Sequence, residues 1–246
     1  MGSAIIVSCE DDAGDTIKPR LMAAGADVGR VHLLDWVLRE GNGAAGRQHF
    51  NAGRDAEALA ALARRVGDVR LIIIDPITAY LGAADSHKTA DVRAALAPMQ
   101  TMAAATGAAV IIVSHLNKGG ENTTAKNRVS GSGAFVAVCR SGWLVATDPQ
   151  DADGKRRVLT PLKNNIGDDK TGFTFTVQPA LVGDGIASSR IEFGPESVTV
   201  TPEDLQSAAA GSAAAELDDE SLRAVVGGLC EAVGFAVPHL DHEFQG

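Results

Sequence analysis

A run of branched apolar residues at positions 71–74 ends in a single carboxylate, Asp75, which is followed by Pro76. A short, uninterrupted run of this kind is typical of a strand that is buried on both faces of a parallel sheet. Asp75 would then lie where the strand leaves the sheet, and open α/β sheets bind their ligands at the carboxyl ends of the strands. Because Mg²⁺ accepts carboxylate oxygens as ligands, Asp75 is a candidate metal ligand.

Three consecutive carboxylates, Glu10, Asp11 and Asp12, follow the apolar run at residues 4–7. Acidic side chains are favoured at the start of a helix, where they accept hydrogen bonds from backbone amides and face the positive end of the helix dipole. Capping explains Asp11 and Asp12 well. Glu10 is better placed to point into the crevice, where it could orient an attacking water as a general base. Taken alone, the cluster favours capping over catalysis.

A second buried-strand pattern, residues 109–114, is followed directly by His115. A histidine at this position could be an ordinary surface side chain. Beside Asp75 on a neighbouring strand, however, it could hydrogen-bond a terminal phosphate. Three strands that each end in a group suited to phosphate and Mg²⁺ chemistry are harder to dismiss than any one of them.

The segment 117–133 is locally positive in an acidic protein, with Lys118, Lys126 and Arg128 against Glu121. It is also rich in Gly, Asn, Ser and Thr. A solvated loop and a loop whose cations bind nucleic-acid phosphates without sequence preference are both consistent with this composition. The composition leaves the two interpretations open.

The remaining pattern predicts an α/β fold with a mainly parallel sheet, because strands alternate with helices. Strands are expected at residues 4–8, 31–34, 71–75 and 109–114, helices at 12–24, 56–65 and 89–106, and a Gly-rich loop at 39–53. Pro98 is expected to kink or disturb the third helix. The turn signal at residues 151–154 and the segments 143–147, 157–162, 171–177 and 190–193 indicate an antiparallel extension at the edge of the parallel sheet.

Bulk properties limit the classes of function. The net charge of −9 argues against a surface that coats nucleic acid broadly, although it allows a local basic loop. The three cysteines, Cys9, Cys139 and Cys230, are far apart, so their spacing suggests neither a zinc site nor a disulfide framework. The sequence shows no membrane-length apolar run and no signal pattern at its start. We expect a soluble, cytoplasmic protein.

Four motifs together resemble the RecA-like AAA-family ATPases, in particular plasmid RepA-type replicative helicases and the ATPase parts of phage and mobile-element primase-helicases. The motifs are Glu10-Asp11 followed by Arg20-Leu21, and the segments 71–76, 110–118 and 128–135. The combination is more specific than any single motif, and the resemblance covers about residues 4–200.

The resemblance implies a role for each matching residue. Glu10 matches the catalytic glutamate, Asp75 the Walker-B aspartate that helps to hold Mg²⁺, and His115 the polar sensor that links the γ-phosphate to the adjacent DNA loop. Arg20 resembles the arginine that stacks on adenine.

Two further positions relate to a neighbouring subunit. Lys163 resembles the lysine of a K-x-R element that hexameric helicases insert into the next subunit's site, but Asn165 stands where that element has arginine. Arg140 is then the remaining candidate for an arginine that acts in trans, and a structural role for it is equally consistent with the sequence.

The main departure from the family is the absence of a G-x-x-x-x-G-K-[ST] loop from these residues. The expected fold is therefore a RecA-like mainly parallel sheet, flanked by helices and missing the P-loop strand and helix. Residues 1–203 would form this ATPase domain, incomplete at its N-terminus, 204–216 a linker, and 217–246 a short helical appendage.

The resemblance implies ATP and Mg²⁺ as cofactors, single-stranded DNA as a partner and a homo-hexameric assembly, with helicase action in the replication of a mobile element. We expect the chain to be inactive alone, because the missing loop supplies the amides and the lysine that hold the phosphates. One alternative is a non-catalytic ATPase-like module for oligomerisation or DNA binding. A generic α/β enzyme whose strand-end carboxylates serve other chemistry is the third.

Overall fold

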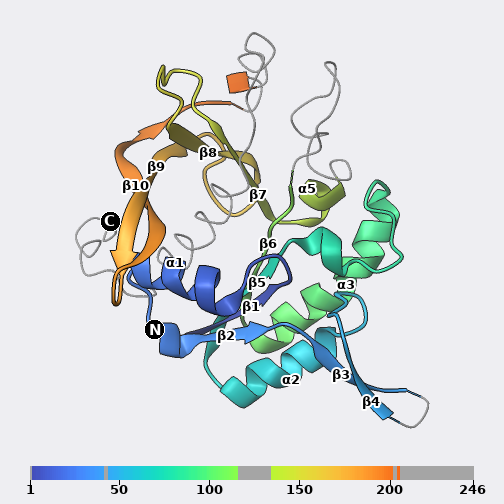
Figure 1. The fold of residues 1–246 in the computed structure, drawn as a ribbon. Helices are drawn as coiled ribbons and strands as arrows, with labels where there is room; N and C mark the ends of the chain where they lie inside the picture. Colours follow the sequence, from blue (N-terminus) through green and yellow to red (C-terminus); the bar gives the residue numbers. More distant parts are fainter. Residues whose placement is uncertain (1, 42–43, 116–133, 202–203, 206–246) are drawn as a thin grey trace.

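The computed structural model describes residues 2–41, 44–115, 134–201 and 204–205 (Figure 1). The first sheet contains four parallel strands in the order β2-β1-β5-β6. Their bounds are β1 Ser3–Ser8, β2 Val31–Leu34, β5 Val69–Asp75 and β6 Ala109–Ile112. The mainly parallel α/β fold predicted from the sequence is confirmed.

The side chains of β5 alternate between two apolar layers, as the pleat of a strand requires. Ile72 and Ile74 join the larger core, while Leu71 and Ile73 join the smaller one, and all four are fully buried. This two-sided burial explains why the segment is apolar at every position. β5 is therefore an interior strand of the sheet.

Helices cover both faces of the sheet (Figure 1). The larger core contains residues of α2, Ala56–Val66, and α3, Thr89–Thr106, whereas the smaller core contains Leu21 of α1, Lys18–Ala23. α2 and α3 are capped at their C-terminal ends by Gly67 and Gly107, whose φ angles of 95° and 71° suit glycine. α3 continues through Pro98.

Short helical turns complete this part of the fold. The helix expected at 12–24 begins with a π-helical turn, η1 Ala13–Ile17, and continues as α1. Two 3₁₀ turns, η2 Val28–Arg30 and η3 Ile77–Tyr80, lead into β2 and out of β5.

The prediction of a Gly-rich loop at residues 39–53 is wrong in its first part, where the chain forms a β-hairpin. β3, Val37–Gly41, pairs antiparallel with β4, Ala44–Gln48, so that Gly41 faces Ala44. The pairing leaves two connecting residues, Asn42 and Gly43, whose structure is not described. Asn-Gly is the pair that two-residue hairpin connections favour. The sequence thus carried a hairpin signal that its glycine content obscured.

The antiparallel strands form a four-stranded sheet of their own in the order β10-β9-β8-β7. They are longer than expected: β7 Ser141–Thr147, β8 Arg156–Asn164, β9 Gly172–Val182 and β10 Ile186–Val198. The short helix α5, Ala134–Val138, precedes them. The expected turn at 151–154 joins β7 to β8, and Gly154 has a φ of 64°.

The expected appendage at 217–246 and most of the expected linker at 204–216 lie outside the described residues. Among the helices that the structure describes, none is long and apolar enough to cross a membrane.

Burial of β5 generates a stability prediction. Replacing Ile73 by Ala should lower the free energy of unfolding by about 2–5 kcal/mol, because buried methyl groups are removed and a cavity remains. Ile166 is 62% exposed, so Ile166→Ala is a matched control and should change the free energy of unfolding by less than about 0.5 kcal/mol. Urea unfolding followed by circular dichroism measures both, and equal losses would contradict the assignment of β5 to the core.

Candidate functional site

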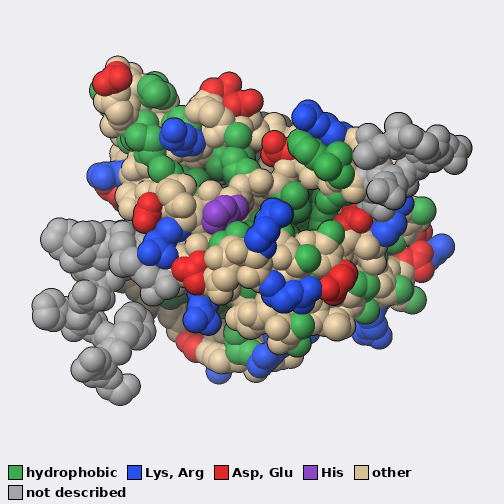
Figure 2. Space-filling model, turned by 90° about the horizontal axis from the view of Figure 1, so that it is seen from below, with side chains coloured by type: hydrophobic (Ala, Val, Ile, Leu, Met, Phe, Trp, Pro, Cys, Tyr) green, Lys and Arg blue, Asp and Glu red, His purple; other side chains and the backbone are tan. Residues whose placement is uncertain are grey.

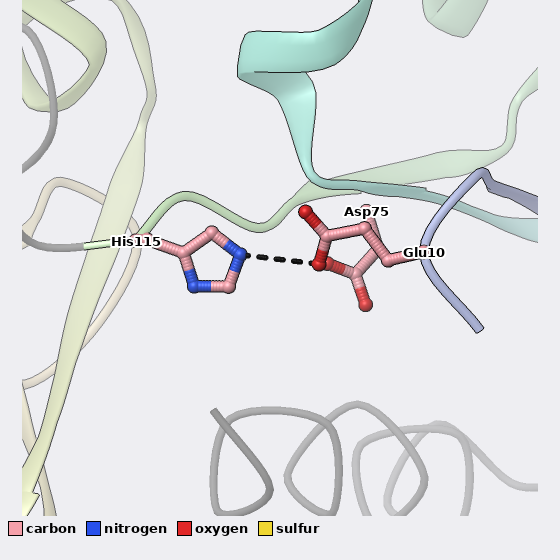
Figure 3. A group of neighbouring side chains, drawn as sticks. All are labelled: Glu10, Asp75 and His115. Carbon is pink, nitrogen blue, oxygen red and sulfur yellow. Dashed lines mark ion pairs between the residues drawn. The ribbon is translucent and has the colours of Figure 1, made fainter. Parts of the chain in front are cut away.

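Glu10, Asp75 and His115 come together at the carboxyl end of the parallel sheet (Figure 3). One ligand atom from each side chain lies within 4.8 Å of the others. The three residues follow or end three adjacent strands, β1, β5 and β6. The structure therefore joins the three strand-end groups that the sequence singled out.

Backbone pairing positions each member of this Glu10–Asp75–His115 cluster. Ser8 pairs with Asp75 in the parallel register, so Glu10 emerges two residues beyond the pair. Beyond β6, the Val113 amide donates to the Ile74 carbonyl and the Val113 carbonyl accepts from the Ile77 amide, both at 2.9 Å. These bonds hold the chain two residues before His115 against the end of β5.

The cluster has a buried side and an accessible side. Asp75 is only 8% exposed, whereas the side chains of Glu10 and His115 are about one-third exposed, at 32% and 33%. The His115 Nε2 atom lies 3.4 Å from Glu10 Oε2. Glu10 and His115 are thus accessible from solvent, whereas Asp75 is nearly buried.

The two acids that follow Glu10 have separate structural tasks. Asp12 is the N-cap of η1 and accepts hydrogen bonds from the amides of Asp15 and Gly14, which lower the pKa of its carboxyl group. Capping is confirmed for Asp12. Asp11, which was also expected to cap, instead pairs with Arg20, with 3.3 Å between Oδ2 and Nη1.

Arg20 is therefore tied to the residue next to Glu10. Its side chain is 22% exposed and comes from α1, which packs beside the sheet. The expected stacking of Arg20 on adenine remains a prediction.

Lys163 lies at the end of β8 and faces the last turn of α5. Its Nζ donates to the carbonyls of Val136, Ala137 and Cys139, at 3.1, 3.2 and 2.7 Å. A lysine at this place satisfies carbonyls that a helix end leaves without partners. The contact is structural within the chain, and the role expected from the resemblance stays a prediction.

Arg140 is exposed, and its carbonyl accepts a hydrogen bond from the Asn165 amide at 2.9 Å. Its expected action in a neighbouring subunit also stays a prediction. The expected nucleic-acid contacts, Lys118, Lys126 and Arg128, lie outside the described residues.

Sequence reasoning missed Tyr80, the single tyrosine of the chain. Tyr80 is 1% exposed and packs edge-on against Phe50, with 5.8 Å between the ring centroids. Burial chiefly, together with the nearby Cys9, Asp75 and Asp35, raises the pKa of the phenol. The hydroxyl group thus stays protonated. Its position five residues after Asp75 was the available sequence signal.

Residues 1–121 match the family model described as "AAA domain". The match extends from the strand before Glu10 to the segment after His115, so it includes the whole Glu10–Asp75–His115 cluster. It supports an AAA-type P-loop ATPase family for this part of the chain. No curated protein matches the chain.

Tyr80 provides a test of how the site is packed. Its hydroxyl oxygen is buried and, among the described residues, meets no partner at hydrogen-bonding distance and angle, with only the weakly polar Cys9 thiol close by. A buried polar group without a good partner costs about 1–3 kcal/mol. Tyr80→Phe should therefore leave the free energy of unfolding unchanged or raise it, whereas Tyr80→Leu should lower it through lost ring packing. Thermal unfolding measures both. A clear loss in Tyr80→Phe would show that the hydroxyl group has a stabilising partner.

Proposed function

We propose that this chain forms the metal and water side of a RecA-like AAA-type ATPase site, which couples ATP hydrolysis to DNA in a RepA-type helicase or replication protein. The observation that carries the proposal is the convergence of Glu10, Asp75 and His115 at the carboxyl ends of adjacent parallel strands. Ligands of open α/β sheets bind at this edge. The AAA-domain match over the same residues supports the family.

In an ATP site, the Asp75 carboxylate fits the role of a Mg²⁺ ligand, and Glu10 and His115 would have other tasks. Asp75, nearly buried and fixed on β5, would hold the ion, which when bound neutralises phosphate charge. Glu10 is exposed enough to contact water and would orient the attacking molecule as a general base. His115 would donate a hydrogen bond to the terminal phosphate, since its Nε2 already faces the same space as the Glu10 carboxylate.

The phosphate-holding side must come from elsewhere. The chain's one Gly-Lys pair, Gly154-Lys155, lies in the β7–β8 turn, where the Lys155 amide donates to Asp151 at 2.7 Å. A loop between two antiparallel strands does not place its amides at a helix N-terminus, as a phosphate-binding loop does. Activity would therefore require a phosphate-binding loop supplied in addition to these residues.

The absence of that loop also favours a second candidate function. The chain could be an ATPase-like module that assembles with complete subunits, up to a hexamer, or with DNA, and that hydrolyses nothing itself. The two functions predict different results when a phosphate-binding loop is added: the ATPase would then hydrolyse ATP, whereas the non-catalytic module would not.

Calorimetric titration of the 246-residue chain with Mg²⁺ and ATP should show no binding at micromolar concentration. The physical reason is that backbone amides and a lysine, which supply most of the phosphate affinity, are missing. Binding, together with hydrolysis that Glu10→Gln abolishes, would establish the ATPase and contradict the proposed inactivity.

Joining the chain to a strand, a G-x-x-x-x-G-K-[ST] loop and a helix should restore ATP hydrolysis. In that fusion, Glu10→Gln should lower kcat at least about 100-fold, because general-base catalysis is lost, with little change in ATP affinity. Glu57→Gln is the matched control, since Glu57 is exposed on α2 and pairs with Arg64. Hydrolysis that survives Glu10→Gln would contradict the role of Glu10. ATP binding without hydrolysis would favour the non-catalytic module.

The DNA part of the proposal rests on the basic segment after His115. On the face that Figure 2 shows, basic and acidic side chains are intermixed, so a local loop is a better candidate than that face as a whole. The double variant Lys126→Ala, Arg128→Ala should bind single-stranded DNA more weakly. The negative slope of log K, the association constant, against log salt concentration should become shallower by roughly 1.4, or 0.7 for each lost phosphate contact. Lys155→Ala with Lys170→Ala is the control, and equal effects of both pairs in fluorescence anisotropy would exclude a dedicated loop.

A further inference from the structure

The Glu10–Asp75–His115 cluster combines two carboxylates with one imidazole. Mg²⁺ prefers an all-oxygen shell, whereas an imidazole nitrogen favours zinc and other first-row transition ions. The ATPase role uses the three side chains for three separate tasks. Their chemistry as a set points to a different ligand.

The separation of the donor atoms fits direct coordination. In a tetrahedral site with bonds of about 2.1 Å, neighbouring donors lie about 3.4 Å apart. His115 Nε2 and Glu10 Oε2 are 3.4 Å apart, and all three ligand atoms lie within 4.8 Å of one another. The outer two side chains are partly exposed, so small rotations can bring them to Asp75 without moving the core.

The three ligands are also held by separate, fixed pieces of backbone. Asp75 ends an interior strand whose residues 71–74 are fully buried, and the register of β1 and the bonds of Val113 position the other two ligands. Two carboxylates and a histidine leave a fourth position for water, as open zinc sites do. A metal site of this kind requires little reorganisation.

We propose that Glu10, Asp75 and His115 together bind a divalent transition ion of the zinc class, in the absence of any nucleotide. The inference goes beyond the proposed ATPase, because it needs no phosphate and holds even if the chain never hydrolyses ATP. With Glu10 and His115 both bound to the ion, Glu10 could not orient the attacking water and His115 could not donate a hydrogen bond to the terminal phosphate. The cluster would then be a point of inhibition by transition metals.

The test is a zinc titration of the complete, untagged chain against a colorimetric chelator, with millimolar Mg²⁺ and no nucleotide. Other zinc-binding groups are removed first: Cys9, exposed beside Glu10, and His239 and His242, three residues apart. In the background Cys9→Ser, His239→Ala, His242→Ala we expect one zinc ion per chain. Adding His115→Ala should weaken binding at least about tenfold.

Two further variants make the result decisive. The Glu10 side chain is partly exposed, so Glu10→Gln should weaken zinc binding and leave the melting temperature unchanged. This variant therefore tests the site even if His115→Ala disturbs the fold. His87→Ala, a histidine beside Asp85 on the surface, should have no effect. Absence of zinc binding in the background variant would overturn the proposal. Zinc binding that is unchanged in both His115→Ala and Glu10→Gln would also overturn it. Displacement of the bound zinc by millimolar Mg²⁺ would overturn it as well.

Discussion

The parallel register of β1, β5 and β6 is the constraint on which the site depends. Parallel strands end at the same edge of a sheet, so the residues that follow them meet without any contact between distant loops. Ser8 pairs with Asp75, and Val113 bonds to both Ile74 and Ile77. The backbone hydrogen bonds of the sheet, rather than contacts among the three side chains, set the geometry of the cluster.

Burial then gives the members of the cluster different properties. Asp75 is only 8% exposed, whereas the side chains of Glu10 and His115 are partly open to solvent. A nearly buried carboxylate suits an ion, and partly exposed groups suit water and phosphate. The same three donors also form a set that a zinc-class ion accepts. Nucleotide chemistry and direct metal binding would therefore compete for one place.

Much of this arrangement could be predicted from the sequence because it depends on local pattern. The unbroken apolar run of β5 and the glycines after α2 and α3 carry their structural meaning within a few residues. The hairpin at β3 and β4 was missed because its glycines suggested a loop, although Asn42-Gly43 is a hairpin pair. The contacts of Asp11 with Arg20 and of Tyr80 with Phe50 join residues outside the local pattern, and the pattern gives no information about such contacts.

The central claim is that the three strand-end side chains form one site with Asp75 as its metal ligand. The most direct measurement is a crystal structure grown with Mn²⁺ and a non-hydrolysable ATP analogue, in a protein that carries a phosphate-binding loop. We predict one anomalous peak within about 2.0–2.6 Å of an Asp75 carboxylate oxygen, with Glu10 and His115 facing the same ligand. An ion bound elsewhere, or Glu10 and His115 turned away from the nucleotide, would contradict the account.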